Sequence, residues 1–144
     1  MRARSEPYLD ANVLVALLTP EPLSTRADDF VCNNPEGLIV SDFAAAEFAS
    51  AIARRVRTRE TTVEDARRDV ADFDVRVARL TVRTDLNASD IAVAATYLRR
   101  LDLTLVVPDA LHIAIARCVD ATLVTFNRAV AVAAGALGVA VAMP

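Results

Sequence analysis

Residues 37–47 read Gly-Leu-Ile-Val-Ser-Asp-Phe-Ala-Ala-Ala-Glu, and this segment indicates the fold class. Its apolar run, 38–40, contains no alternating polar positions, which is typical of a strand buried on both faces. Ser41 follows as a helix N-cap, and the helix is expected to reach about Arg57. A short buried strand that passes directly into a helix is the repeating unit of a parallel α/β sheet.

The same alternation of strand and helix continues through the rest of the chain. Further strands are predicted from short apolar runs at residues 8–9, 80–82, 122–125 and 139–142. Helices are predicted between them at residues 12–18, 24–32, 63–77, 89–101, 109–118 and 128–134. The sequence therefore predicts an α/β fold with a central parallel sheet covered by helices on both faces, in one domain over residues 1–144.

Caps and breakers set the expected helix ends. Asn12 is expected to cap the first helix, and Thr61 forms a predicted capping box with Glu64, three residues later. Pro108 fits the first turn of helix 109–118. Gly135 is expected to close helix 128–134.

Burial is predicted for two further sets of side chains. In helix 89–101, Ile91, Ala95 and Leu98 are expected to face the core because they fall at helical spacing. Cys32 and Cys118 are far apart and form no CxxC pair. We therefore interpret them as two buried thiols in a reducing compartment.

Composition limits the classes of function. The chain has 144 residues, of which 54% are hydrophobic, so a packed fold is expected. All 16 basic residues are Arg, and the net charge is −3. Any nucleic-acid substrate would therefore have to meet a local basic patch or a bound metal. The uncharged tail, 129–144, is shorter than the ~20 residues of a membrane span, so we expect a cytoplasmic protein without a membrane segment.

Acidic and amide side chains gather at one predicted edge of the sheet. Asp10 ends the first strand, and Glu47 lies in the first two turns of the helix after the second. Asp109 opens a helix after an apolar stretch, and Asn127 follows the strand at 122–125. Ligands of open parallel sheets bind beyond the carboxyl ends of the strands, so these four residues are the candidate catalytic set.

Glu47 carries the strongest local signal. Its neighbours on the same helical face are Phe43, Ala44, Ser50 and Ala51, all small or apolar. Buried carboxylates need a partner, and the chain has no Lys to provide one. A divalent cation such as Mg²⁺ or Mn²⁺, which prefers carboxylate oxygens and water, would serve.

Each residue alone also has a plainer interpretation. Asp109 would favour a helix N-terminus through the dipole, Asp10 would be a turn acid, and Asn127 a helix cap. His112 is interpreted as a packing or supporting residue rather than a catalyst. The Arg54–Arg59 cluster is typical of a solubilising helix end. The case for a site rests on the shared location of the acids.

Four segments resemble the motifs of the PIN-domain family, in order and with matching spacing. They are Tyr8-Leu9-Asp10-Ala11-Asn12, Ser41-Asp42-Phe43-Ala44-Ala45-Ala46-Glu47-Phe48, Pro108-Asp109-Ala110-Leu111-His112-Ile113-Ala114 and Leu123-Val124-Thr125-Phe126-Asn127-Arg128. The third is the most specific, being close to the Asp-Ala-Leu-His string of toxin-type members. The resemblance covers nearly the whole chain.

The resemblance implies a three-layer α/β/α fold and a ribonuclease that depends on Mg²⁺ or Mn²⁺. Members of this size are typically VapC-type toxins of type II toxin–antitoxin pairs, inhibited by a cognate antitoxin and often homodimeric. It also implies that Asp10, Glu47 and Asp109 bind the metal. Asn127 stands at the fourth catalytic position, where the family often has Asp, so the number of metals stays open.

In the same way, the resemblance implies that Asn12 and Thr125 orient the acids. Phosphoacceptor domains also place acids at strand ends, but they rely on a Lys, which this chain lacks. A PIN-like module that binds RNA or protein with little or no cleavage remains the alternative, because Asn127 weakens the acidic set.

Overall fold

The computed structural model describes residues 5–144. Within this part, five parallel strands form one sheet in the order β3-β2-β1-β4-β5. The strands are β1 (Pro7–Leu9), β2 (Leu38–Ser41), β3 (Thr81–Thr84), β4 (Thr122–Val124) and β5 (Val141–Ala142). The helices are α1 (Ala11–Leu18), α2 (Ser24–Asn33), α3 (Asp42–Arg57), α4 (Val63–Leu80), α5 (Ala88–Leu98), α6 (Val107–Cys118) and α7 (Arg128–Ala136).

Adjacent residues of each central strand face opposite sides of the sheet. Tyr8 belongs to the core cluster that includes the buried residues of α5, α6 and α7. Leu9 belongs to the other cluster, with the buried residues of α1, α2, α3 and α4. A strand whose successive side chains enter two cores must be apolar at every position, which explains the continuous apolar runs.

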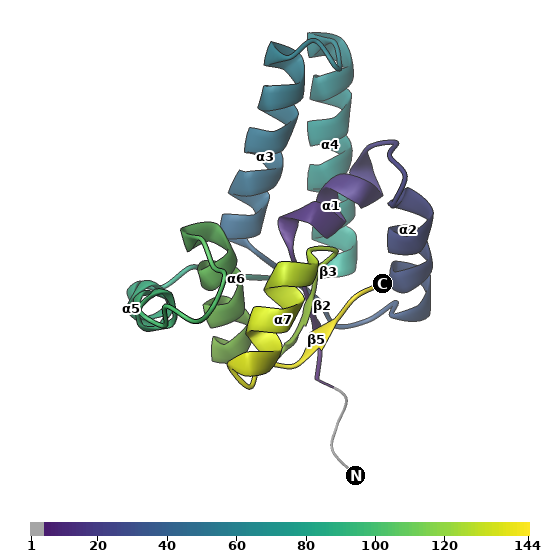
Figure 1. The fold of residues 1–144 in the computed structure, drawn as a ribbon. Helices are drawn as coiled ribbons and strands as arrows, with labels where there is room; N and C mark the ends of the chain where they lie inside the picture. Colours follow the sequence, from purple (N-terminus) through teal and green to yellow (C-terminus); the bar gives the residue numbers. More distant parts are fainter. Residues whose placement is uncertain (1–4) are drawn as a thin grey trace.

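Helices therefore cover both faces, and the predicted three-layer α/β/α fold is confirmed. On one side α6 packs against α5, and its residues 110–116 are all buried. On the other side α3 and α4 pack together as a long hairpin, with α1 lying across its base (Figure 1).

The order of the strands positions the candidate site. β1 lies at the centre, paired with β2 on one side and β4 on the other. Asp10 follows β1 directly, and Thr125 follows β4 directly. Ser41 ends β2 and caps α3, because its hydroxyl accepts a hydrogen bond from the backbone N–H of Ala44 at 2.9 Å. Three neighbouring strands thus deliver polar residues to one edge of the sheet.

Three predicted helix ends are wrong. Thr62, not Thr61, caps α4, because its hydroxyl is the one that accepts from the backbone N–H three residues ahead. Asn12 lies inside α1, where its side chain bonds across to other segments instead of capping the helix. Gly135 is within α7, and Gly138, with φ +74, follows the helix in the left-handed conformation that glycine adopts freely.

Two predictions of burial are also wrong. In α5, Ile91 and Ala95 are exposed, and Asp90, Ala94 and Tyr97 are buried instead. An Ala-rich helix offers weak contrast between its faces, so the inward face was misplaced by one residue. Leu98, the third residue of that set, is half-buried and does pack against the core.

Cys32 and Cys118 are both exposed rather than buried. Each lies at the end of its helix, α2 or α6, where the chain turns away from the core. Within residues 5–144, no helix is long and apolar enough to span a membrane. The single domain predicted over residues 1–144 includes residues 1–4, which lie outside the described part, and its extent stays a prediction.

Candidate metal centre

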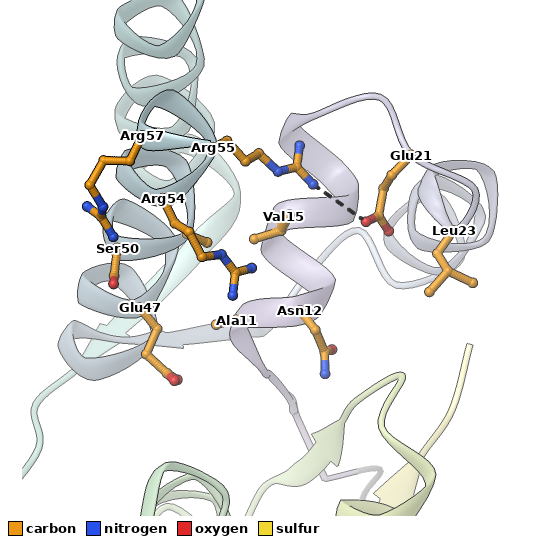
Figure 2. A pocket seen from close by; sticks show the side chains of 11 residues that line it. Ala11, Asn12, Val15, Glu21, Leu23, Glu47, Ser50, Arg54, Arg55 and Arg57 are labelled. Atoms are coloured by element: carbon orange, nitrogen blue, oxygen red, sulfur yellow. Dashed lines mark ion pairs between the residues drawn. The ribbon is translucent and has the colours of Figure 1, made fainter. Parts of the chain in front are cut away.

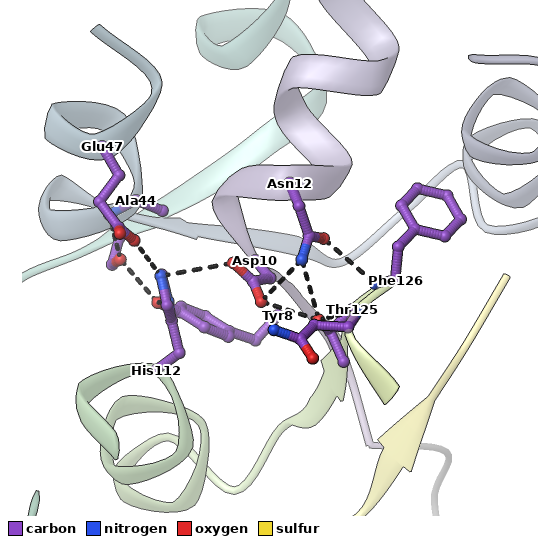
Figure 3. A network of polar contacts seen from close by, with 10 residues as sticks. Tyr8, Asp10, Asn12, Ala44, Glu47, His112, Thr125 and Phe126 are labelled. Carbon is purple, nitrogen blue, oxygen red and sulfur yellow. Dashed lines mark hydrogen bonds and ion pairs between the residues drawn. The ribbon is translucent and has the colours of Figure 1, made fainter. Parts of the chain in front are cut away.

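Asp10 is the buried carboxylate at the centre of the site. Its side chain is only 8% exposed. Thr125 donates its hydroxyl to Oδ2 of Asp10 at 2.8 Å, and Asn12 donates its amide to the same oxygen at 3.3 Å (Figure 3). Both donors bind Oδ2 and hold the carboxyl group in one orientation, with Oδ1 facing His112.

Asn12 and Thr125 are themselves fixed by a small network. The Asn12 amide also donates to Oγ1 of Thr125 at 3.1 Å, and its carbonyl oxygen accepts from the backbone N–H of Phe126 at 3.1 Å (Figure 3). The backbone N–H of Asn127 donates to Oγ1 of Thr125 at 3.1 Å. An orienting role was predicted for Asn12 and Thr125, and it requires a geometry of this kind.

Glu47 and His112 form the second half of the site. Glu47 extends from α3 with 30% of its side chain exposed, and its carboxylate is hydrogen-bonded to Nε2 of His112 (Figure 3). The same Nε2 lies 3.5 Å from Oδ1 of Asp10. His112, in α6, is almost completely buried. One imidazole nitrogen therefore faces both carboxylates.

The opposite nitrogen of His112 is held by the sheet. Its Nδ1 lies 2.7 Å from the hydroxyl of Tyr8, which lies 2.8 Å from Oγ of Ser41. Burial raises the pKa of Tyr8 well above its usual range, and the Ser41 hydrogen bond opposes this only in part. The Tyr8 hydroxyl therefore stays protonated, and it holds the His112 ring in place through Nδ1.

The expectation that the carboxylates would lack a basic partner is wrong. His112 is that partner. Burial alone lowers the pKa of His112, but the hydrogen bond to Glu47 and the charges of Asp10, Glu47 and Asp109 outweigh it, so the net pKa is raised. The sequence signal was its position three residues after Asp109, which places both on one face of α6.

Asp109 lies close to this group but outside its tight core. It is the third residue of α6 and is half-buried. Burial raises the pKa of its carboxyl; the charge of Asp10 adds to this, His112 opposes it, and Glu47 adds again. Within residues 5–144 it makes no side-chain hydrogen bond or ion pair.

Asn127 serves the helix that follows it. Its side-chain oxygen accepts from the backbone N–H groups of Ala129 at 3.0 Å and Val130 at 3.4 Å, so it caps α7. The amide oxygen that would face a metal or water is thus engaged with the backbone. The catalytic role expected for Asn127 stays a prediction.

The donor set suits a divalent cation. Asp10, Glu47 and His112 each offer one ligand atom, and these atoms lie within 4.8 Å of one another. Two carboxylates, with a third from Asp109 beside them, are oxygen donors of the kind that Mg²⁺ and Mn²⁺ take. The residues present therefore fit a bound divalent ion.

Comparisons with known proteins identify a family and a fold. A family model described as the PIN domain matches residues 8–136. No curated protein gives a significant match. Solved structures resemble the fold at low sequence identity. One is VapC20 of Mycobacterium tuberculosis, described as a sarcin–ricin loop cleaving toxin, with TM-score 0.67, 17% identity, and 82% of this chain and 87% of that chain covered.

Two further structures are toxin–antitoxin assemblies. VapBC2 of Rickettsia felis, bound to a DNA fragment from its promoter, has TM-score 0.68 and 18% identity, with 95% of this chain and 97% of that chain covered. A toxin–antitoxin complex from Klebsiella pneumoniae has TM-score 0.62 and 18% identity, with 85% and 87% covered. At these identities the likeness shows a shared fold and nothing more.

Proposed function

The chain belongs to the PIN-domain family, and on this premise we propose that it is a divalent-metal-dependent ribonuclease acting as the toxin of a bacterial toxin–antitoxin pair in the cytoplasm. The observation that carries the proposal is the convergence of Asp10, Glu47 and His112 at the carboxyl edge of the sheet. Acids gathered there, in a fold of this family, are arranged for phosphodiester hydrolysis.

Asp10, Glu47 and Asp109 would hold the metal, Mg²⁺ or Mn²⁺. When bound, the ion supplies charge neutralisation at the phosphate and activates water for hydrolysis. Asn12 and Thr125 orient the Asp10 carboxylate through their hydrogen bonds to it. His112 holds a proton beside Glu47, and the Tyr8 hydroxyl fixes the plane of its ring. Asn127 is proposed as the fourth catalytic position.

The partner would be an antitoxin protein. Structural neighbours that are toxin–antitoxin complexes support this. An acidic site invites a cation, so an antitoxin segment is expected to place an Arg or Lys near Asp10 and Glu47, where its charge would stand in for the metal. Pairing of two copies as a homodimer is part of the same proposal.

RNA cleavage by purified protein tests the nuclease. The wild type should cut single-stranded RNA in Mn²⁺ and be inactive in EDTA, and Asp10→Asn should be inactive in both. Cleavage that persists in Asp10→Asn would point to a contaminant. If the wild type binds RNA but leaves it intact in Mn²⁺, the non-cutting PIN-like module is the correct description.

Growth of a bacterial host tests the toxin. Expression of the wild type should stop growth, Asp10→Asn should not, and co-expression of the cognate antitoxin should restore growth. A complex with that partner in which its chain lies away from Asp10 and Glu47 would contradict the proposed mode of inhibition.

A further inference from the structure

We propose that Arg54 and Arg57 of α3 form a phosphate-binding track for the RNA strand, leading away from the metal site. This inference rests on the proposed ribonuclease function and adds to it the residues that hold the substrate. It also gives a role to the arginine cluster, which the sequence alone leaves as a solubilising helix end.

A groove begins at the candidate metal centre and runs along α3. Its volume is about 460 Å³. Asn12 and Glu47 line one end, and Arg54 and Arg57 line it further along the helix (Figure 2). The groove is therefore continuous with two residues of the site and acquires positive charge with distance from it.

Helical spacing puts these residues on one stripe. Glu47, Ser50, Arg54 and Arg57 follow one another at intervals of three or four residues, so they lie along the same face. Long side chains of a helix lean toward its N-terminus. Accordingly, the guanidinium of Arg54 points back toward Glu47 and Asn12, as Figure 2 shows.

The two arginines are available for a ligand. Arg55, between them, is engaged: it lies 3.9 Å from Oε2 of Glu21 and donates to Oγ1 of Thr19 at 2.8 Å. For Arg54 and Arg57 no ion pair is found within residues 5–144, and both are exposed. Among the described residues, no acid pairs with their positive charges, although the net charge of the protein is −3.

An RNA strand, with phosphodiester groups at regular intervals, is the ligand that this arrangement fits. Seven residues separate Arg54 from Glu47, which is about 10 Å along the helix axis before the side chain leans back. A strand whose scissile phosphate lies beside Glu47 would therefore bring a neighbouring phosphate to Arg54 and a more distant one to Arg57. The guanidinium fork pairs well with two phosphate oxygens. An acidic segment of a protein partner is the competing occupant.

Equilibrium binding tests the track without relying on cleavage. The probe is a fluorescein-labelled single-stranded RNA of mixed sequence and roughly 12 nucleotides, within the length that single-strand sites cover. Its anisotropy is measured in EDTA over a range of salt, with wild type, Arg54→Ala, Arg57→Ala, the double variant and Arg54→Lys. Arg67→Ala is the matched control, because Arg67 is exposed on α4 and does not line the groove that begins at the metal centre; it lines a second groove, which Arg57 also borders.

We expect Arg54→Ala to weaken binding roughly tenfold, the lower end for a charge-assisted hydrogen bond. Each Ala substitution should reduce the slope of log K against log salt by about 0.7, the value for one phosphate contact on a single strand. Arg54→Lys should keep the slope, and Arg67→Ala should match the wild type. In Mn²⁺, the Arg54 variant should raise KM more than it lowers kcat.

The track is overturned if Arg54→Ala and Arg57→Ala bind RNA with the same affinity as Arg67→Ala. It is also overturned by a loss of antitoxin binding with RNA binding unchanged, since that would assign the arginines to a protein partner. Failure of the nuclease proposal has a different signature: the wild type leaves RNA intact in Mn²⁺, whatever the anisotropy shows. Arginine-dependent RNA binding in that case would still support the track.

Discussion

Tyr8 of β1 and His112 of α6 share a buried hydrogen bond, with Tyr8 Oη 2.7 Å from Nδ1 of His112. The contact links the central strand to the helix that covers it. β1 thus supplies Asp10 to the site and, two residues earlier, the group that orients the imidazole beside Asp10. One strand thereby sets the positions of an acid and of the base that faces it.

Removing the Tyr8 hydroxyl should destabilise the protein. In Tyr8→Phe, Nδ1 of His112 and Oγ of Ser41 lose a buried partner, so the free energy of unfolding should fall by about 1–3 kcal/mol. Denaturation by urea measures this. Tyr97→Phe is the control, because Tyr97 is also buried but its hydroxyl contacts, among residues 5–144, only the exposed Arg117, at 3.2 Å. An equal loss of unfolding free energy in both variants would show that the buried Tyr8–His112 hydrogen bond contributes no more to stability than the Tyr97–Arg117 contact.

Divalent metal should stabilise the fold. Binding to the native state alone adds about 2.7 kcal/mol when the free ion is at about a hundred times its Kd. The melting temperature should therefore rise in millimolar Mn²⁺ at neutral pH, and EDTA should reverse the rise. Glu47→Gln should show little or no rise. If millimolar Mn²⁺ leaves the melting temperature of the wild type unchanged, the result would count heavily against the metal centre.

The Thr125 hydroxyl should act as a positioning group for Asp10. Thr125→Val keeps the shape but removes the donor at 2.8 Å from Oδ2 of Asp10. Stability should fall by about 1–3 kcal/mol, and kcat for RNA should fall more than KM changes. Thr125→Ser restores a hydroxyl and should recover most of kcat. A Val variant that is less stable but keeps the kcat of the wild type would reduce Thr125 to a structural role.

The location of the site could be predicted from the sequence because it follows from topology. Apolar strands that lead into helices define a parallel sheet, and acids just beyond those strands must meet at one edge. Asp10 and Glu47 were found in this way, and the structure brings them together around one imidazole.

The details that depend on side-chain direction could not be predicted in the same way. His112 lies on an entirely buried helix segment, where periodicity does not show which core an imidazole enters. The inward face of α5 was misplaced because alanines surround Ile91 on the helix. The choice between Thr61 and Thr62 as cap depends on backbone dihedral angles that two adjacent threonines do not reveal.

The sharpest test of the metal centre concerns Asp109, whose carboxyl feels the charges of Asp10, His112 and Glu47. Burial and the charges of Asp10 and Glu47 raise its pKa. The ionised form therefore costs stability in the metal-free protein above the folded pKa, and this cost is relieved as the pH falls through that pKa. Asp109→Asn removes the charge at neutral pH and keeps the size.

The decisive measurement pairs the melting temperature of Asp109→Asn in EDTA with its RNA cleavage in Mn²⁺, on one preparation. The account predicts that cleavage falls by orders of magnitude while the melting temperature holds or rises, because repulsion from Asp10 and Glu47 is relieved. An acid that only favours the start of α6 would instead lose about 0.3–1 kcal/mol of stability on substitution. A variant that melts lower and cleaves RNA as the wild type does would falsify the assignment of Asp109 to the metal centre.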